Sequence, residues 1–134
     1  MDAADRPGRD EMLDALLDLS HDLGKYLRMP LAMLPAEAGP GDVREALEHA
    51  LRRTRVGPRG VRGAREIWAG FHEECAAALA GRPGFDALAG AVARALAWER
   101  AIDGVEEIDR AALTRDFADV SRRIRELIEE VSGG

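Results

Sequence analysis

The stretch Asp10–Leu34 reads DEMLDALLDLSHDLGKYLRMPLAML and carries the clearest periodicity of the 134-residue chain. Its apolar side chains recur at steps of three and four, at Met12, Leu16, Leu19, Leu23 and Tyr26. Such steps place residues on one face of a helix, so the stretch predicts an amphipathic helix. Charged side chains recur on the opposite face, at Asp14, Asp18, His21, Lys25 and Arg28. We therefore expect His21 to be exposed.

The ends of this first helix are marked by local signals. Asp10 is a residue type that caps helix N-termini, and we expect the helix to begin there. Pro30 restricts the residue before it, so the helix should end or kink at Met29. Residues 1–9 are expected to form a flexible tail, and residues 10–132 the folded domain.

The rest of the chain predicts further helices over residues 42–55, 64–80, 84–103 and 109–132. Asp42 followed by Glu45 resembles a capping box with Asp42 as the cap. The last of these segments repeats apolar residues at alternating steps of four and three, at Leu113, Phe117, Val120, Ile124, Leu127 and Val131. No strand-type alternation is apparent. Helices joined by short loops predict an all-α fold, an antiparallel bundle of four to five helices in a single domain.

The helical faces predict which side chains lie in the core. We expect seven large apolar residues to be buried, namely Leu16, Leu23, Leu47, Phe71, Leu88, Phe117 and Ile124. The polar faces predict that His21, Lys25, His49 and His72 are exposed. Cys75 lies on an apolar stripe and is expected to be a small buried residue and not a nucleophile.

Composition excludes several classes of function. The formal net charge is −6, which argues against general affinity for nucleic acid or an anionic membrane. One cysteine cannot form an internal disulfide, and no apolar run reaches membrane-spanning length, so we expect a cytoplasmic protein. Lys25 is the single lysine among 19 basic residues, an arginine bias that favours a GC-rich, bacterial genome.

A basic run surrounds the strongest break in the helical pattern. Residues 57–63 read GPRGVRG, and the surrounding arginines are Arg52, Arg53, Arg55, Arg59, Arg62 and Arg65. The run is either a docking patch for phosphate or an acidic partner, or a solvated loop.

The segment Ser20-His21-Asp22-Leu23 resembles the start of the phosphoacceptor helix of sensor-kinase dimerisation domains and of phosphotransfer proteins. Arg28-Met29-Pro30-Leu31-Ala32 resembles the continuation of that helix, with four additional residues between the two parts. The resemblance implies that His21 accepts a phosphoryl group from a receiver domain. Asp22 would orient the ring or accept a proton, and Lys25 would offset phosphoryl charge. No cofactor is expected for this chemistry.

The same segment, His21-Asp22-Leu23-Gly24-Lys25, also resembles the central His-Asp motif of HD-domain metal phosphohydrolases. In that family the His-Asp pair ligates a divalent metal together with another His upstream. His21 is the first histidine of this chain, so that upstream ligand is absent. We therefore expect no bound metal and no enzymatic activity, and a degenerate relative of this family remains an alternative.

The remaining alternative is a bundle that acts by its surfaces alone. Such a protein would bind a protein partner, or would associate with itself as a homodimer through the apolar seams of the first or last helix. The function that the sequence favours is thus partner binding, with phosphotransfer at His21 as its most specific form.

Overall fold

The fold is known from a computed structural model, which describes residues 8–104 and 106–133. Its helical elements are α1 (Arg9–Leu19), the π-helix η2 (Ser20–Lys25), α2 (Tyr26–Ala32), α3 (Pro40–Arg52), α4 (Ala64–Leu79), α5 (Pro83–Ala97), the 3₁₀-helix η3 (Trp98–Ala101) and α6 (Arg110–Gly133). Two short strands, β1 (Arg55–Gly57) and β2 (Gly60–Arg62), lie between α3 and α4. The predicted all-α class and single domain are confirmed.

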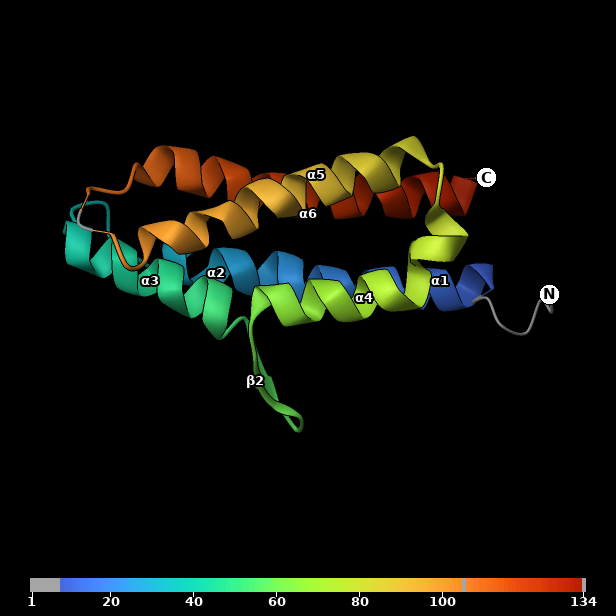
Figure 1. The fold of residues 1–134 in the computed structure, drawn as a ribbon, viewed down its shortest axis with the longest axis horizontal. Helices are drawn as coiled ribbons and strands as arrows, with labels where there is room; N and C mark the ends of the chain where they lie inside the picture. The colour runs from blue at the N-terminus through green and yellow to red at the C-terminus, as the bar shows by residue number, and fades with distance from the viewer. Residues whose placement is uncertain (1–7, 105, 134) are drawn as a thin grey trace.

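The described helices form an antiparallel bundle in which four segments run the length of the molecule (Figure 1). The first segment is α1, η2 and α2 without a break, and the second is α3 followed by α4. The third is α5 with η3, and the fourth is α6, which packs along α5 and against α1, η2 and α2. Arg9 donates a hydrogen bond to the carbonyl oxygen of Ser132, so α1 begins beside the end of α6.

The core is made by the apolar stripes that the sequence predicted. All seven of the predicted core residues are buried, and the four residues predicted to be exposed are exposed. The seams of the first and last helices face this core: Leu16, Leu113 and Phe117 are 0% exposed. A homodimer would therefore have to use other residues than these seams.

α1 and α3 each begin before the aspartate that we had expected to cap them. α1 begins at Arg9, which places Asp10 in the first turn and not at the cap. α3 begins at Pro40, and Asp42 is its third residue. The Asp42 carboxylate accepts a hydrogen bond from the backbone N–H of Gly39 at 3.3 Å, so it satisfies a free donor of the helix end from inside the helix.

The first helix does not end at Met29, so that part of the prediction for Pro30 was wrong. α2 continues through Pro30 to Ala32. Proline removes one backbone hydrogen bond from a helix. Leu27 and Leu31, on either side of it, are 1% and 4% exposed, and their burial offsets that loss.

Residues 55–62 form an antiparallel hairpin, where we had expected the end of a helix and a loop. Arg55 pairs with Arg62 and Val56 with Val61. Gly60, at the end of the two-residue turn, has φ +83°, a conformation that glycine adopts freely. The hairpin projects from the bundle at the junction of α3 and α4 (Figure 1).

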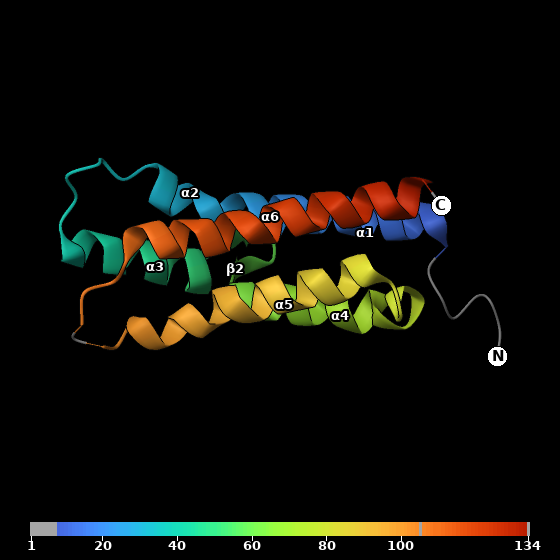
Figure 2. The same cartoon turned by 90° about the horizontal axis from the view of Figure 1, so that it is seen from above.

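Seen from above, α2 lies on one side of α6 and α5 lies on the other (Figure 2). The described part of the chain contains no helix with the length and apolar character needed to span a membrane.

Candidate functional site at His21

The motif Ser20–Lys25 is a single π-helical segment between two α-helices. A π-turn holds more residues than an α-turn, so it shifts the residues after it around the helix, and such turns are frequent at functional sites. Leu23 and Gly24 are buried here, Asp22 is half-buried and His21 is exposed. Within the motif, Leu23 and Gly24 thus face the core, whereas His21 and Lys25 face solvent.

His21 and Asp22 make a direct contact. The imidazole Nδ1 lies 3.1 Å from Asp22 Oδ1, and the histidine side chain is 48% exposed. Because a carboxylate only accepts hydrogen bonds, the contact assigns the proton to Nδ1. Nε2 then carries the free lone pair. His21 therefore has the tautomer and exposure of a nucleophile or a proton acceptor.

The Asp22 carboxylate also binds both strands of the hairpin. Arg55 Nε lies 3.0 Å from Asp22 Oδ1, and one terminal nitrogen of Arg62 lies 3.5 Å from Asp22 Oδ2. The two arginines are opposite each other across the strands, where like charges destabilise the pairing. Asp22 lies between them and offsets this repulsion, so one carboxylate orients His21 and holds the hairpin against η2.

A cleft of about 300 Å³ lies between η2 and the hairpin. It is lined by Asp18, His21, Asp22, Arg55, Gly57, Pro58, Arg59, Gly60 and Arg62. Three arginines against two aspartates leave one net positive charge around the imidazole. Arg59 lies in the turn of the hairpin, is exposed, and makes no ion pair with any residue in the described ranges. The cleft can therefore accept an anion beside His21.

Tyr26 supports the imidazole from the next turn. Its ring meets the His21 ring edge to face, with centroids 5.1 Å apart and planes at 83°. The Arg55 guanidinium lies 5.5 Å from the Tyr26 centroid, and Lys25 Nζ lies 5.8 Å from it. Lys25 is exposed but does not line the cleft. The cations that line the cleft are Arg55, Arg59 and Arg62, all from the hairpin. The sequence pattern alone does not connect these arginines with His21.

A phosphoacceptor helix would use Gly24 to keep the surface beside His21 low for a docking partner, and the structure contradicts that expectation. Gly24 is buried against α6, where a Cβ atom would come 2.9 Å from Ser121 Oγ. The glycine thus allows α6 to approach η2 closely, and it does not lower the surface beside His21.

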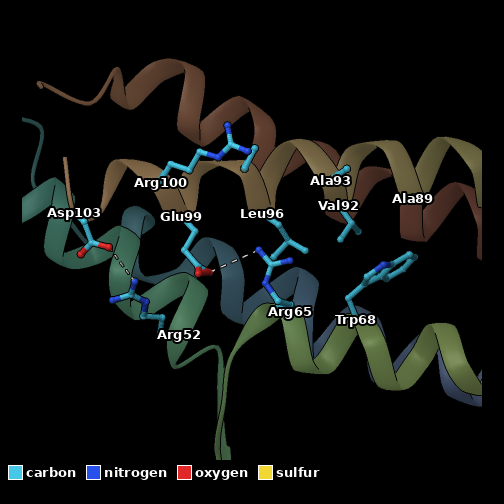
Figure 3. Close-up of a pocket in the computed structure, with 11 residues that line it drawn as sticks. Arg52, Arg65, Trp68, Ala89, Val92, Ala93, Leu96, Glu99, Arg100 and Asp103 are labelled. Carbon is cyan, nitrogen blue, oxygen red and sulfur yellow. Dashed lines mark ion pairs between the residues drawn. The ribbon is translucent and has the colours of Figure 1, made fainter.

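The six arginines of the basic run do not form one surface. Arg55, Arg59 and Arg62 gather at the cleft, and Arg53 is exposed beyond the end of α3. Arg52 pairs with Glu48 at 3.5 Å and Asp103 at 3.7 Å, and Arg65 pairs with Glu99 at 3.9 Å. These last two arginines face a different groove, between α4 and α5 with η3 (Figure 3).

The groove in Figure 3 has a volume of about 640 Å³. Its apolar lining includes Trp68, Val92 and Leu96, and the ion pairs Arg65–Glu99 and Arg52–Asp103 lie across it. Trp68 is half-buried and packs against Phe71, with ring centroids 5.6 Å apart. Arg100 also lines the groove and makes no ion pair within the described residues, so three arginines against two acidic residues leave one net positive charge there as well.

The donor set at His21 does not favour the metal site of HD-domain hydrolases. Asp22 directs its oxygens at two guanidinium groups and His21 directs Nδ1 at Asp22, so a metal ion would have to displace these partners. Within residues 8–104 and 106–133, no group of three or more His, Cys, Asp or Glu side chains is arranged to hold a metal ion. His49 and His72 are exposed on other helices.

Cys75 is buried, and burial together with the nearby charge of Glu74 raises the pKa of its thiol to about 11. Its thiolate is therefore scarce at neutral pH, as expected for a packing residue.

Comparison with known proteins gives no relative: no family model, no curated protein and no solved structure matches this chain.

Proposed function

We propose that this protein is a phosphotransfer adaptor: a helical bundle that binds a partner protein at the hairpin face and accepts a phosphoryl group on His21 Nε2. The observation that carries the proposal is the contact of His21 Nδ1 with Asp22 Oδ1 at 3.1 Å on a half-exposed ring. This contact leaves Nε2 as the free nucleophilic nitrogen.

The transfer step follows from these atoms. Nε2 attacks the phosphorus of an acyl phosphate on the partner, an N–P bond forms, and the bond from phosphorus to the acyl oxygen breaks. The partner's carboxylate leaves with the electron pair of that bond. Positive charge develops on the imidazole ring, and Asp22 stabilises it through the proton on Nδ1. The reaction needs no metal or cofactor from this chain.

The hairpin supplies the charge for the incoming phosphoryl group. Arg59 lines the cleft beside His21 and is free to contact phosphate oxygens, because no acidic side chain in the described residues pairs with it. Guanidinium groups match phosphate in shape and charge. Arg55 and Arg62 act on His21 through Asp22, so we regard them as positioning residues.

The outer side of the hairpin is suited to contact with a protein. Side chains alternate between the two faces of a strand, so Val56 and Val61 point away from the side that carries Arg55 and Arg62. Both valines are more than half exposed, at 58% and 54%. These two valines form a small exposed apolar surface next to the charged cleft, which a docked partner would cover.

The proposal is tested by incubating the protein with a panel of phosphorylated receiver domains from the same organism and tracing the phosphate. We expect an acid-labile label, as formed on a nitrogen, that disappears in His21→Gln. The matched control is His49→Gln, which changes an exposed histidine on α3 and should leave labelling intact. Arg59→Gln should reduce transfer more than Lys25→Ala, because Arg59 lines the cleft and Lys25 does not. Labelling by no receiver, or labelling that persists in His21→Gln, would overturn phosphotransfer.

Partner binding is tested separately from transfer. A receiver that docks on the hairpin should associate more slowly with Arg59→Glu than with the unmodified protein. Raised salt should slow its association with the unmodified protein, since exposed charges are screened beyond about 10 Å at 0.1 M salt. Val61→Ser should raise the dissociation rate. A receiver that binds all variants equally does not use the hairpin.

A further inference from the structure

A second basic surface lies on the outer side of α6, away from the hairpin. Arg115, Ala118, Arg122 and Arg125 follow one another at steps of three, four and three, which places them in one row along the helix. Ten residues of helix extend about 15 Å. Ala118 is small and exposed in the middle of the row, so the three arginines stand above a shallow depression.

Arginines from two other helices flank this row. Arg28 comes from α2 and Arg94 from α5, and together with the α6 row they line a groove of about 730 Å³. The close approach of Gly24 to Ser121 brings η2 against α6, and Arg28 Nε donates to the carbonyl oxygen of Gly24 at 3.3 Å. The groove is therefore built on one of the tightest helix contacts of the bundle.

The positive charge of the groove exceeds its negative charge. Five arginines and two aspartates line it, which leaves a net charge of three positive units in a chain whose formal charge is −6. Both aspartates are already engaged. Asp116 accepts a hydrogen bond from Trp98 Nε1 at 2.7 Å, and Asp119 binds Arg94 at 3.0 Å as well as Arg122.

The ionisation of Asp119 follows from the same contacts. Burial of its carboxyl group opposes ionisation, but the hydrogen bonds from Arg122 and Arg94 outweigh burial and lower its pKa. Asp119 therefore stays a carboxylate and holds these guanidinium groups in place. Arg28 and Arg125 have no acidic partner in the part of the chain that the structure describes, so their charges face solvent unmatched.

We propose that this groove binds a phosphate chain, as found in inorganic tripolyphosphate and in the tail of a nucleoside triphosphate. A ligand with three or four closely spaced negative charges balances the three positive units that the groove carries. Guanidinium groups bind phosphate oxygens through paired N–H donors. The groove lining contains no aromatic side chain on which a base could stack, so the chain of phosphates is the recognised part.

The test is calorimetric titration of the full chain with inorganic tripolyphosphate and, separately, with ATP. We expect both to bind with similar affinity, and binding to weaken as salt is raised. Arg125→Gln should raise the dissociation constant roughly ten-fold, the usual contribution of one charge-assisted hydrogen bond. Arg53→Gln removes an equally exposed arginine outside the groove and should leave affinity within about two-fold of the unmodified protein, a change of under 0.5 kcal/mol. Both substitutions are at exposed residues, and far-ultraviolet circular dichroism of each variant should match that of the unmodified protein.

Each alternative has its own result. Binding of ATP without binding of tripolyphosphate would place recognition in the nucleoside and overturn the proposal. Tighter binding of a short poly-glutamate peptide than of tripolyphosphate would assign the groove to an acidic protein segment. If Arg125→Gln and Arg53→Gln weaken tripolyphosphate binding equally, the binding depends on the net charge of the protein and not on this groove. Absence of binding at low salt would refute the site. Arg59→Gln removes the unpaired cation of the cleft at His21 and should bind tripolyphosphate as the unmodified protein does, which distinguishes the two sites.

Discussion

Replacing Asp22 with asparagine tests the link between the histidine and the hairpin. Asparagine has the shape of aspartate but no charge, so it keeps the packing and removes the attraction to Arg55 and Arg62. The hairpin would then carry two arginines opposite each other without a carboxylate between them. We expect the hairpin to separate from η2 and the whole domain to lose stability.

The magnitude follows from the geometry of the two contacts. The Arg55 contact, at 3.0 Å, is a close ion pair, whereas Arg62 donates a hydrogen bond at 3.5 Å, the longest distance at which one forms. The aspartate side chain is 20% exposed and each arginine 29%, so solvent screens part of the attraction. We expect a loss of about 1–2 kcal/mol, between the values for exposed and for fully buried charged hydrogen bonds.

Urea denaturation measures this loss in Asp22→Asn. Asp18→Asn is the matched control, because Asp18 lines the same cleft, is exposed and forms no ion pair within the described segments. Hydrogen exchange of the amides in residues 55–62 should quicken in Asp22→Asn and not in the control. A stability difference between the two variants below about 0.5 kcal/mol, with unchanged hairpin exchange, would refute the role that we assign to Asp22.

Three further outcomes are expected. Leu23→Ala should lower the free energy of unfolding by about 2–5 kcal/mol, because Leu23 is 1% exposed. Leu17→Ala should change it little, because Leu17 is 56% exposed, and chemical denaturation of both variants measures the difference. Cys75 should resist alkylation in the folded state at pH 8, since its pKa is about 11, and should react at the rate of unfolding; labelling as fast as in urea would contradict its burial. The pKa of Asp119 is lower in the folded state than its value of about 4 in the unfolded chain, so its ionised form stabilises the fold above that pH. Acid titrations should therefore show that the stability difference between the unmodified protein and Asp119→Asn shrinks as the pH falls below about 4. A difference independent of pH would show that the ion pairs of Asp119 do not contribute.

The sequence marked the turn of the hairpin but not its strands. Gly57, Pro58 and Gly60 are turn residues, whereas Val56 and Val61 are single apolar positions on either side of them. The strands are three residues each, too short for alternation to be visible. The arginines on both sides made the segment resemble a solvated loop, because their partner lies more than 30 residues away in the sequence.

The sequence alone determined the bundle, its core and the exposure of its histidines. These features depend on helical periodicity, which is local and repeats over many residues, so single errors at Asp42 or Pro30 moved a boundary without changing which face is buried. The tertiary structure decided the site. Three features of the sites join residues that are distant in sequence. They are the packing of Gly24 against Ser121, the contact of Asp22 with Arg55, and the position of Arg28 beside the arginines of α6. Periodicity assigns a residue to a face of its own helix, but the packing of the helices decides which residue of another segment faces it.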